Sequence, residues 1–499
     1  MNTIILTTLN ARYIHTAFGL RYLYANMGEL QLSTTLLEFG LGQRAADICE
    51  KLLQHQPKII GFGIYIWNVF EITTIVQTLK KVAPEVIIIL GGPELSHPPD
   101  LPDVAVLADY IITGHAEISF PFLCRQLLAG DRSSEKVING QSADLANLVS
   151  PYPYYTDIDL RQRVVYVEAS RGCPFKCEFC LSALDTTAKP FALHDFLQNM
   201  DVLFQRGARN FKFIDRTFNL KIDSSIAILE FFLVRLNDEL NLHFEVIPDN
   251  LPERLKHVIA QFPAGVLQFE IGVQSFDPHI QQLISRKQDN EKTMANLLWL
   301  REFSSTHIHA DLIVGLPGDT LEGFGKSFDK LIALRPQEIQ VGILKRLRGA
   351  PINRHTESYR MCYDSNPPYA ILSTRDISFT DIQRLNRFAR YWDLIGNSGR
   401  FVQTLPLILS DQPFVRFLQF TDALFLLVDS TWKIGLKRLF ELTYRVITEN
   451  MQVPDTMALA VLAADYQRSG EKARPDFLQT PDCVLIKRPV ANKRQRQLL

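Results

Sequence analysis

Short apolar runs separated by helical stretches constrain the first part of this chain more than any other feature. Four such runs occur, at residues 3–7, 59–66, 86–90 and 110–113. Continuous apolar strands that alternate with helices are typical of a parallel sheet covered on both faces. We therefore expect residues 1–135 to form an α/β domain of the Rossmann-like type, with ligands bound at the carboxyl ends of its strands.

A second α/β series begins after a polar, proline-containing stretch that we expect to be a linker, residues 136–163. Its six expected strands are residues 164–169, 211–214, 242–246, 266–273, 310–313 and 338–344. With helices between them, they predict a partial (β/α)6 barrel of the TIM type over residues 164–360, with its chemistry at the C-terminal strand ends. Apolar residues at helical spacing predict a mostly helical C-terminal domain over residues 365–490.

Three cysteines stand close together directly after the first strand of this second series. Residues 169–180 read ASRGCPFKCEFC, so Cys173, Cys177 and Cys180 are separated by three and then two residues. Cysteine thiolates are the usual ligands of iron–sulfur clusters. Three ligands leave one iron of a four-iron cube open, where the amino and carboxylate groups of S-adenosylmethionine (SAM) can bind. A zinc knuckle needs four ligands, and no fourth cysteine or histidine follows nearby.

This C-x3-C-x2-C motif resembles that of the radical SAM superfamily, in which it follows the first barrel strand. Phe179, the aromatic residue before the last cysteine, is also typical of that family. The resemblance covers about residues 160–350. It implies an enzyme with a 4Fe–4S cluster that cleaves SAM, and a cluster held by the three cysteines.

Further segments extend the resemblance to enzymes such as oxygen-independent coproporphyrinogen oxidase. They read FEV at 244–246, EIGVQSF at 270–276 and DLIVGLPGDT at 311–320. The resemblance implies that four residues line the SAM pocket, namely Glu245, Gln274, Arg286 and Asp311. Asp215 and Arg216 are further candidates, because FKFIDRTFN occupies the place where relatives have a glycine-rich turn.

The first domain resembles the cobalamin-binding domain of cobalamin-dependent radical SAM enzymes. The matching segments read GFGIYIWN at 61–68, IILGGPELS at 88–96 and DYIITGHAEISF at 109–120. The resemblance implies a set of residues that face cobalamin, namely Tyr65, Trp67, Asn68, Gly91, Gly92, Pro93, Gly114 and Glu117. The alternatives are a Rossmann-like domain without a ligand, and a nicotinamide site, which lacks the G-x-G-x-x-G fingerprint after the first strand.

The signature that gives classical cobalamin domains a histidine on cobalt, D-x-H-x-x-G, is absent. His15 has neither the aspartate nor the glycine at the required distance, so we interpret it as an ordinary residue of a loop or helix start. No histidine from that motif is therefore expected on the lower face of cobalamin.

Composition and charge limit the possible partners and location. The 499 residues contain 53 basic and 54 acidic side chains, a formal net charge of −1, which gives no field for nucleic acid or an anionic membrane. No apolar run reaches the ~18 residues of a membrane span, and the first residues do not read as a signal peptide, so we expect a cytoplasmic protein. The other cysteines, at 49, 124, 362 and 483, are expected to be small core residues, and the basic run at 487–496 a frayed terminus.

Together the two resemblances imply a methyltransferase that acts on an unactivated carbon of an unknown substrate, with an electron donor such as flavodoxin or ferredoxin. A cobalamin-dependent cyclase or rearrangement enzyme is the nearest alternative. A methylthiotransferase of transfer RNA needs three N-terminal cysteines, and this chain has two in its first domain, Cys49 and Cys124. A non-catalytic cobalamin or redox sensor would have no need of the four SAM-pocket residues.

Overall fold

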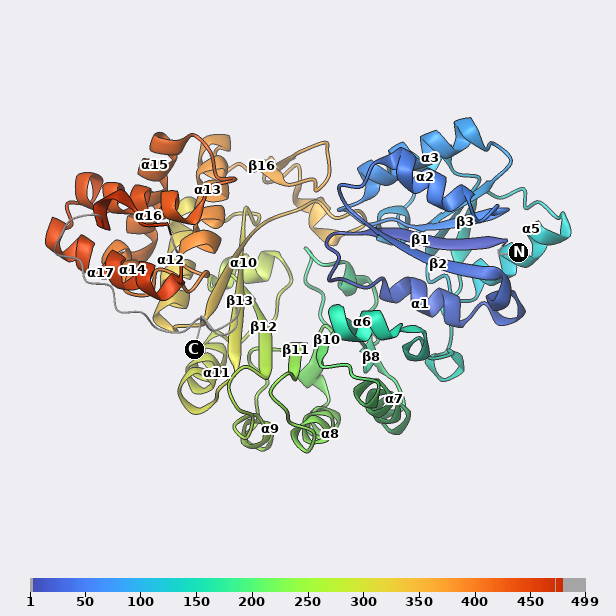
Figure 1. Ribbon diagram of the computed structural model, residues 1–499, viewed down its shortest axis with the longest axis horizontal. Coiled ribbons are helices and arrows are strands. Elements are labelled where there is room, and N and C mark those ends of the chain that lie inside the picture. The colour runs from blue at the N-terminus through green and yellow to red at the C-terminus, as the bar shows by residue number, and fades with distance from the viewer. Residues whose placement is uncertain (1–2, 472, 479–499) are drawn as a thin grey trace. The chain divides into compact units, whose positions relative to one another are not determined.

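The structure is a computed structural model that describes residues 3–471 and 473–478. Its contacts divide the chain into two units, which are described separately below. The first consists of Met1–Phe244, Lys345–Asn353 and Asp364–Ala370; the second consists of Glu245–Leu344, Arg354–Tyr363 and Ile371–Leu499. Figure 1 labels the elements along the chain.

The first unit contains a six-stranded parallel sheet with the order β2-β1-β3-β4-β5-β6. Its strands are β1 Ile4–Asn10, β2 Thr34–Gly40, β3 Ile59–Gly63, β4 Ile87–Gly91, β5 Tyr110–Gly114 and β6 Val137–Gly140. The sheet extends past the boundary expected at residue 135, because Ile111 of β5 pairs with Val137 of β6.

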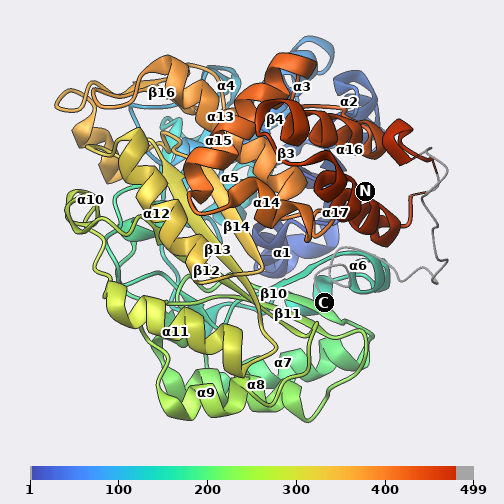
Figure 2. The ribbon, with the colours of Figure 1, turned by 90° about the vertical axis from the view of Figure 1, so that its left-hand side faces the viewer.

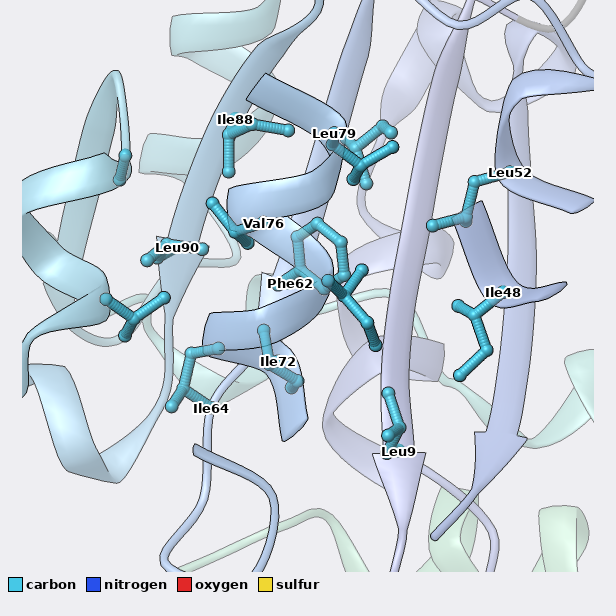
Figure 3. Close-up of a cluster of buried hydrophobic side chains, with 14 of the residues drawn as sticks. Leu9, Ile48, Leu52, Phe62, Ile64, Ile72, Val76, Leu79, Ile88 and Leu90 are labelled. Atoms are coloured by element: carbon cyan, nitrogen blue, oxygen red, sulfur yellow. The ribbon is translucent and has the colours of Figure 1, made fainter. Parts of the chain in front are cut away.

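Helices cover both faces of this sheet, as the apolar strands predict (Figure 1). They are α1 Phe18–Ala25, α2 Ala45–Leu53, α3 Val69–Val82, α4 Val104–Leu107 and α5 Ser119–Ala129. Ile5 and Leu9 of β1 pack with α2 and α3 in one core cluster (Figure 3). Ile4 and Leu6 belong to a second cluster with α1 and α5. Since both sides of each central strand are buried, the strands are continuous apolar runs rather than alternating ones.

The stretch expected to be a linker is packed rather than free. Tyr152 and Tyr155 are buried, and the Tyr155 hydroxyl donates to the backbone oxygen of Tyr166 at 2.8 Å. Asp159 in α6 (Asp157–Gln162) forms a buried ion pair with Arg21 of α1 at 2.9 Å. These contacts hold the segment against α1 of the first domain and against the strand that contains Tyr166, which composition alone did not indicate.

The second sheet has six strands in the order β14-β13-β12-β11-β10-β7, with β7 and β14 at its edges. They are β7 Val165–Val167, β10 Asn210–Phe213, β11 Asn241–Glu245, β12 Leu267–Gln274, β13 His307–Val314 and β14 Glu338–Ile343. The helices between them are α7 Leu193–Gln205, α8 Ile222–Leu233, α9 Glu253–Ile259, α10 Pro278–Leu283, α11 Asn290–Phe303 and α12 Leu321–Ala333. The predicted partial barrel is confirmed.

In the second unit, strand β13 has one apolar, buried face and one polar face. Ile308, Ala310 and Leu312 are fully buried on one face, and α11 and α12 run alongside the strands (Figure 2). The alternate residues His307, His309 and Asp311 are polar and partly exposed. Because side chains alternate across a strand, this polar set lies on the opposite face of the sheet.

The C-terminal domain is mostly helical, as expected. Its helices are α13 Phe379–Ile395, α14 Thr404–Leu409, α15 Pro413–Val428, α16 Leu436–Arg445 and α17 Asp455–Ser469. Trp392 of α13 packs edge-on against Phe328 of α12, with the ring centroids 4.9 Å apart. The Asn397 side chain donates to and accepts from the backbone of Ile339, both at 2.9 Å, and so covers part of edge strand β14.

Three smaller predictions can be placed as well. Cys49 and Cys124 are buried as expected, but Cys362, at the start of the short strand β15 (Cys362–Tyr363), is exposed. Cys483 and the basic run at 487–496 lie outside the described residues. Among the residues described, no helix has the length and apolar character that crossing a bilayer requires.

Candidate active site

The three motif cysteines lie in one loop that follows β7 and the short strand β8 (Ser170–Arg171). Cys173 and Cys177 are buried, Cys180 is partly exposed, and all three are free thiols. Burial raises the pKa of the Cys173 thiol, and the nearby sulfurs of Cys180 and Cys177 raise it further. The fold therefore brings the three thiols close enough to interact.

Backbone constraints hold the start of this loop. Gly172 has φ +92°, and a Cβ atom there would lie 2.9 Å from the backbone nitrogen of Ala188. The Cys173 amide donates to the backbone oxygen of Asp185 at 2.9 Å, and Arg171 pairs with Lys189 of β9 (Lys189–Pro190). Glycine is thus required next to the first cysteine by the protein's own backbone.

The loop offers three thiols as ligands. Within residues 3–471 and 473–478, no three His, Cys, Asp or Glu side chains are arranged to hold one metal ion. A four-iron cube binds three cysteines through three different irons, so the thiols need not converge on one point. Phe179 is partly buried in the loop, and the exposed Arg216 is near enough for its charge to oppose the rise in the Cys173 pKa.

Two cavities in the first unit lie where the strands of its first sheet end. One, of about 210 Å³, is lined by the ends of β3, β4 and β5. The other, of about 480 Å³, is lined by the end of β1, the start of α1 and the end of β7. They share four lining residues, Gly19, Tyr65, Glu117 and Arg171. The first cavity is lined mainly by glycine and apolar residues, and the second adds polar side chains, so together they offer both kinds of surface to a large ligand.

Most residues predicted to contact cobalamin line these cavities. The first cavity is lined by Tyr65, Gly91, Gly92, Gly114 and Glu117. Trp67 lines the second, where its ring stacks on that of Tyr65 with centroids 4.5 Å apart and planes 5° apart. The Trp67 indole also donates to the backbone oxygen of Leu9 at 3.1 Å. The two rings are therefore held face to face, at the margin of both cavities.

Asn68 and Pro93 line neither cavity. Asn68 is fully buried, and its amide oxygen accepts from the backbone nitrogen of Tyr65 at 2.8 Å. Its amide nitrogen donates to Thr8 Oγ1 and to the Leu9 oxygen, both at 3.0 Å. Pro93 begins a single 3-10 turn after Gly92. Both residues hold the loops that carry the lining residues.

Gly92 is needed for a reason that differs from the expected one. Its φ is +108°, and a Cβ atom there would lie 2.5 Å from the backbone oxygen of Ile64. The clash would be with the protein's own backbone and not with a ligand. A Cβ on Gly91 would lie 3.5 Å from the oxygen of Ile112, an ordinary contact. A substitution at Gly91 therefore tests the cavity without a clash with the backbone.

Most lining residues of the second cavity were not among the predicted site residues; they include His15, Tyr166, Glu168 and Arg171. His15 lies in the loop before α1, as expected, and its Nδ1 is 2.6 Å from the Tyr166 hydroxyl. Burial, together with the charge of Lys212, lowers the pKa of His15. The sequence signal for Arg171 was its place directly before Gly172 and Cys173, whereas nothing local marked His15 or Tyr166.

Asp215 is a buried carboxylate at the end of β10. It accepts from the Ala169 amide at 2.9 Å and from Ser170 Oγ at 2.6 Å. Burial raises the pKa of Asp215 to about 7, although these hydrogen bonds oppose the rise. Asp215 lines a small cavity of about 40 Å³.

The predicted SAM-pocket residues belong to the second unit and lie at or near strand ends. Glu245 ends β11, and Gln274 ends β12 at a β-bulge. Gln274 has φ +68° although it is not glycine, and its buried Oε1 has no hydrogen-bond partner. A strained backbone and an unsatisfied buried oxygen are features of ligand-binding positions, so Gln274 fits a polar ligand.

Arg286 and Asp311 are each held by neighbours in this unit. The Arg286 guanidinium donates to the backbone oxygen of Gly272, and its Nε donates to Gln288 Oε1 at 3.0 Å. Asp311 Oδ1 lies 3.2 Å from His309 Nε2, and His309 Nδ1 lies 3.2 Å from Glu338.

His309 is consequently held as a cation on the polar face of the barrel. Burial alone would lower its pKa, but the hydrogen bonds to Asp311 and Glu338 raise the pKa of His309 to about 10.

Comparison with known proteins assigns parts of the chain to protein families. Residues 4–123 match the family model of the B12 binding domain, and residues 167–331 match that of the radical SAM superfamily. The chain joins a B12-binding domain to a radical SAM domain. A third model, for a protein family of unknown function (DUF4080), matches residues 357–497. The expected cofactors are thereby confirmed as a 4Fe–4S cluster, SAM and cobalamin, since these are what the two assigned domain types use.

Individual proteins are similar to large parts of the chain. An uncharacterized methyltransferase of Pyrococcus horikoshii is 22% identical over 56% of this chain and 64% of its own length. The cobalamin-dependent radical SAM methyltransferase TokK of Streptomyces tokunonensis is 23% identical over 60% of this chain and 48% of its own. The matched parts thus make up about half to two thirds of these curated relatives. The solved structure of the cobalamin-dependent SAM radical enzyme OxsB with aqua-cobalamin matches with a TM-score of 0.62, at 15% identity over 94% of this chain and 79% of its own. That likeness confirms the fold.

Proposed function

We propose that this protein is a cobalamin-dependent radical SAM methyltransferase that methylates an unactivated carbon of its substrate. The observation that carries the proposal is the sharing of residues between the two cofactor regions of the first unit. Arg171, two residues before Cys173, lines both cavities at the ends of the first sheet. Glu168, at the end of β7, lines the larger cavity beside Tyr65 and Trp67 of the B12-binding domain. A cluster loop whose neighbouring residue lines two adjoining cavities supports joint use of both cofactors.

When bound, the cluster and SAM supply the radical that removes hydrogen from carbon, and cobalamin supplies the methyl group. The protein's own residues hold and shield these groups. Cys173, Cys177 and Cys180 would bind three irons. Tyr65 and Trp67 would line the cobalamin site, while Gly91 and Gly114 would let the backbone approach the cofactor.

The SAM pocket is proposed on four residues of the second unit. The Arg286 guanidinium suits the methionyl carboxylate, because a planar fork of donors matches two carboxylate oxygens. Glu245, Gln274 and Asp311 offer oxygens to hydroxyl or ammonium groups. The unpaired Oε1 of Gln274 gives this assignment structural support.

The family resemblance supports the chosen reaction. The relatives described above include two proteins named as methyltransferases. Radical SAM enzymes need a reductant, and we propose flavodoxin or ferredoxin as the electron donor. The proposed domains remain residues 1–135, 164–360 and 365–490, with β6 added to the first.

Incubation with labelled SAM tests the proposal. The anaerobically reconstituted protein, with cobalamin and a reductant, is given SAM that carries a trideuterated methyl group and a small-molecule extract. We expect products in which one trideuteromethyl group replaces hydrogen, together with 5′-deoxyadenosine. The Cys177→Ala variant is the control and should form neither.

The same experiment separates the alternatives. Formation of 5′-deoxyadenosine with a substrate whose mass falls or stays constant would replace methyl transfer by ring closure or rearrangement. No 5′-deoxyadenosine from protein that holds its cluster would contradict radical chemistry altogether.

A further inference from the structure

One arginine joins the two cofactor-bearing parts of the first unit. The Arg171 guanidinium donates to Glu117 Oε1 at 2.8 Å and to Glu168 Oε1 at 2.7 Å. Glu117 follows β5 of the B12-binding domain, and Glu168 follows β7 of the radical SAM domain. The Arg171 guanidinium therefore links the B12-binding domain, through Glu117, to Glu168 and the strand end of its own domain.

This bridge is largely withdrawn from water. The side chains of Glu168, Glu117 and Arg171 are 6%, 10% and 19% exposed. The guanidinium lies over the ring of Tyr22, 4.8 Å from its centroid. The Tyr22 hydroxyl hydrogen-bonds Glu168; burial and this carboxylate raise the Tyr22 pKa. Loss of the guanidinium would leave two carboxylates together in a poorly hydrated place, which is strongly unfavourable.

Arg171 is fixed firmly on the side of the cluster loop. It pairs with Lys189 in the β8–β9 ladder, and the next residue, Gly172, adopts a conformation that admits no Cβ. Cys173 follows at once and is held through the Asp185 oxygen. A movement of Arg171 would therefore also move Cys173.

On the side of the B12-binding domain, the residues of this ion-pair bridge line both cavities. Glu117 and Arg171 line both cavities, and Gly114, at the start of the same turn, lines the first and has φ +63°. A ligand that fills these cavities would contact both partners of the ion pair. It would thereby restrict the turn at 114–117 and the position of the guanidinium together.

We propose that Arg171 is a positioning residue that couples cobalamin binding to the cluster loop, an inference that rests on the proposed function. The cluster and cobalamin each restrict one end of the same ion-pair bridge. Whichever binds second therefore costs less conformational entropy. Coupling of this kind is reciprocal: if the cluster tightens cobalamin binding, cobalamin stabilises the cluster by the same factor.

The test is a set of cobalamin affinities measured with and without the cluster. Hydroxocobalamin is titrated anaerobically into cluster-free and cluster-loaded protein, for the wild type, Arg171→Gln, Arg171→Lys and Arg125→Gln. We expect the loaded wild type to bind cobalamin about fivefold more tightly or better, and Arg171→Gln to show nearly equal affinities. Arg171→Lys should keep only part of the coupling, because an ammonium keeps the charge but lacks the two-pronged donor geometry.

Arg125→Gln is the matched control, since it also breaks an arginine–glutamate pair in this domain. Its partner is Glu29 at 2.6 Å, and both side chains are well exposed, 45% and 66%. This variant should couple as the wild type does. A merely structural role of Arg171 would lower both affinities and leave their ratio unchanged, which would overturn the inference.

Glu117→Gln provides a second route if Arg171→Gln does not fold. It removes the charge from the other end of the bridge with almost no change of size, and it should also abolish the coupling. Full coupling in either variant would contradict the inference while leaving the proposed function intact. A wild type that binds no cobalamin, or takes up no cluster, would instead contradict the proposed function itself.

Discussion

Gln274 combines two unfavourable features at one position. Its backbone lies in the left-handed region at φ +68°, where glycine is favoured, and its buried Oε1 is unpaired. Neither feature helps the protein to fold, and both lie at the end of β12, where we propose that Gln274 binds SAM. The neighbouring β-bulge between Gly272 and Gln274 turns this side chain out of the regular strand register.

Comparison of Gln274→Ala with Gln274→Gly separates binding from strain. Both variants should bind SAM more weakly, by about 1–2 kcal/mol or roughly five- to thirtyfold, because both lose the amide. The glycine variant should be more stable than the alanine variant by about 1 kcal/mol, since glycine tolerates this φ. Calorimetric titration of the cluster-loaded protein and denaturant unfolding measure the two effects. Equal SAM affinity in the wild type and both variants would remove Gln274 from the pocket.

Asp215 should make the cofactor-free protein less stable as the pH rises. Burial raises the pKa of Asp215 to about 7, above its value in the unfolded chain. Between these two values the folded state holds a proton that the unfolded state has lost, so stability falls as the pH rises through this range. Asp215→Asn removes this titration and keeps one of the two side-chain oxygens that accept from Ala169 and Ser170. In urea unfolding, the wild type should lose stability relative to the variant between pH 5 and pH 8. If the free energies of unfolding of the two proteins change with pH in the same way, the Asp215 pKa is ordinary.

At the scale of elements, the glycines at strand ends decide where a ligand can approach. Gly91 ends β4 and lines the first cavity, whereas Gly40 ends β2 and lines neither. Neither has a positive φ, and a Cβ on either would meet nothing closer than 3.5 Å. The two positions are therefore matched except for the cavity.

We expect Gly91→Val to lose most of its bound cobalamin, because the added side chain takes up space in the cavity. Gly40→Val should retain it, and both variants should keep the cluster. Cobalamin that remains on the protein after anaerobic gel filtration, read from its absorbance, measures the difference. Equal retention by the two variants would place cobalamin elsewhere.

The strands and helices with strong patterns could be predicted from sequence, and those with weak patterns could not. Runs such as 86–90 are buried on both faces and gave β4 within a residue or two. β2 carries threonine and glutamate in a mostly half-buried edge strand, and β6 is four residues long, so neither had a clear apolar signature.

The sequence predicted which residues belong to the site better than it predicted the contacts between them. The cysteines and the glycine turns carry local motifs, so their positions could be found. The bridge of Arg171 with Glu117 depends on contacts over 54 residues of sequence, and the role of Asn68 depends on Thr8 and Leu9. Such long-range pairings are set by tertiary packing, which no local pattern records.

At the scale of the molecule, buried charges tie distant segments of the first unit together. Arg21 of α1 pairs with Glu38 of β2 at 2.7 Å and with Asp159 of α6 at 2.9 Å, and all three side chains are nearly inaccessible. Arg348, from a much later part of the chain, pairs with the buried Glu94 at 3.3 Å. Breaking one partner of such a pair is costly because the other stays buried and charged. These ties keep the loop after β4 and the linker in place around the cavities.

The central claim is that one chain holds a cluster on its three motif cysteines and cobalamin in its first domain. Metal analysis of anaerobically reconstituted protein after gel filtration tests it most directly. We predict about four irons and one cobalt per chain for the wild type. The Cys173→Ala, Cys177→Ala, Cys180→Ala triple variant should lose the iron and keep the cobalt. Iron retained by the triple variant as well as by the wild type, or no cobalt on either protein, would contradict the account.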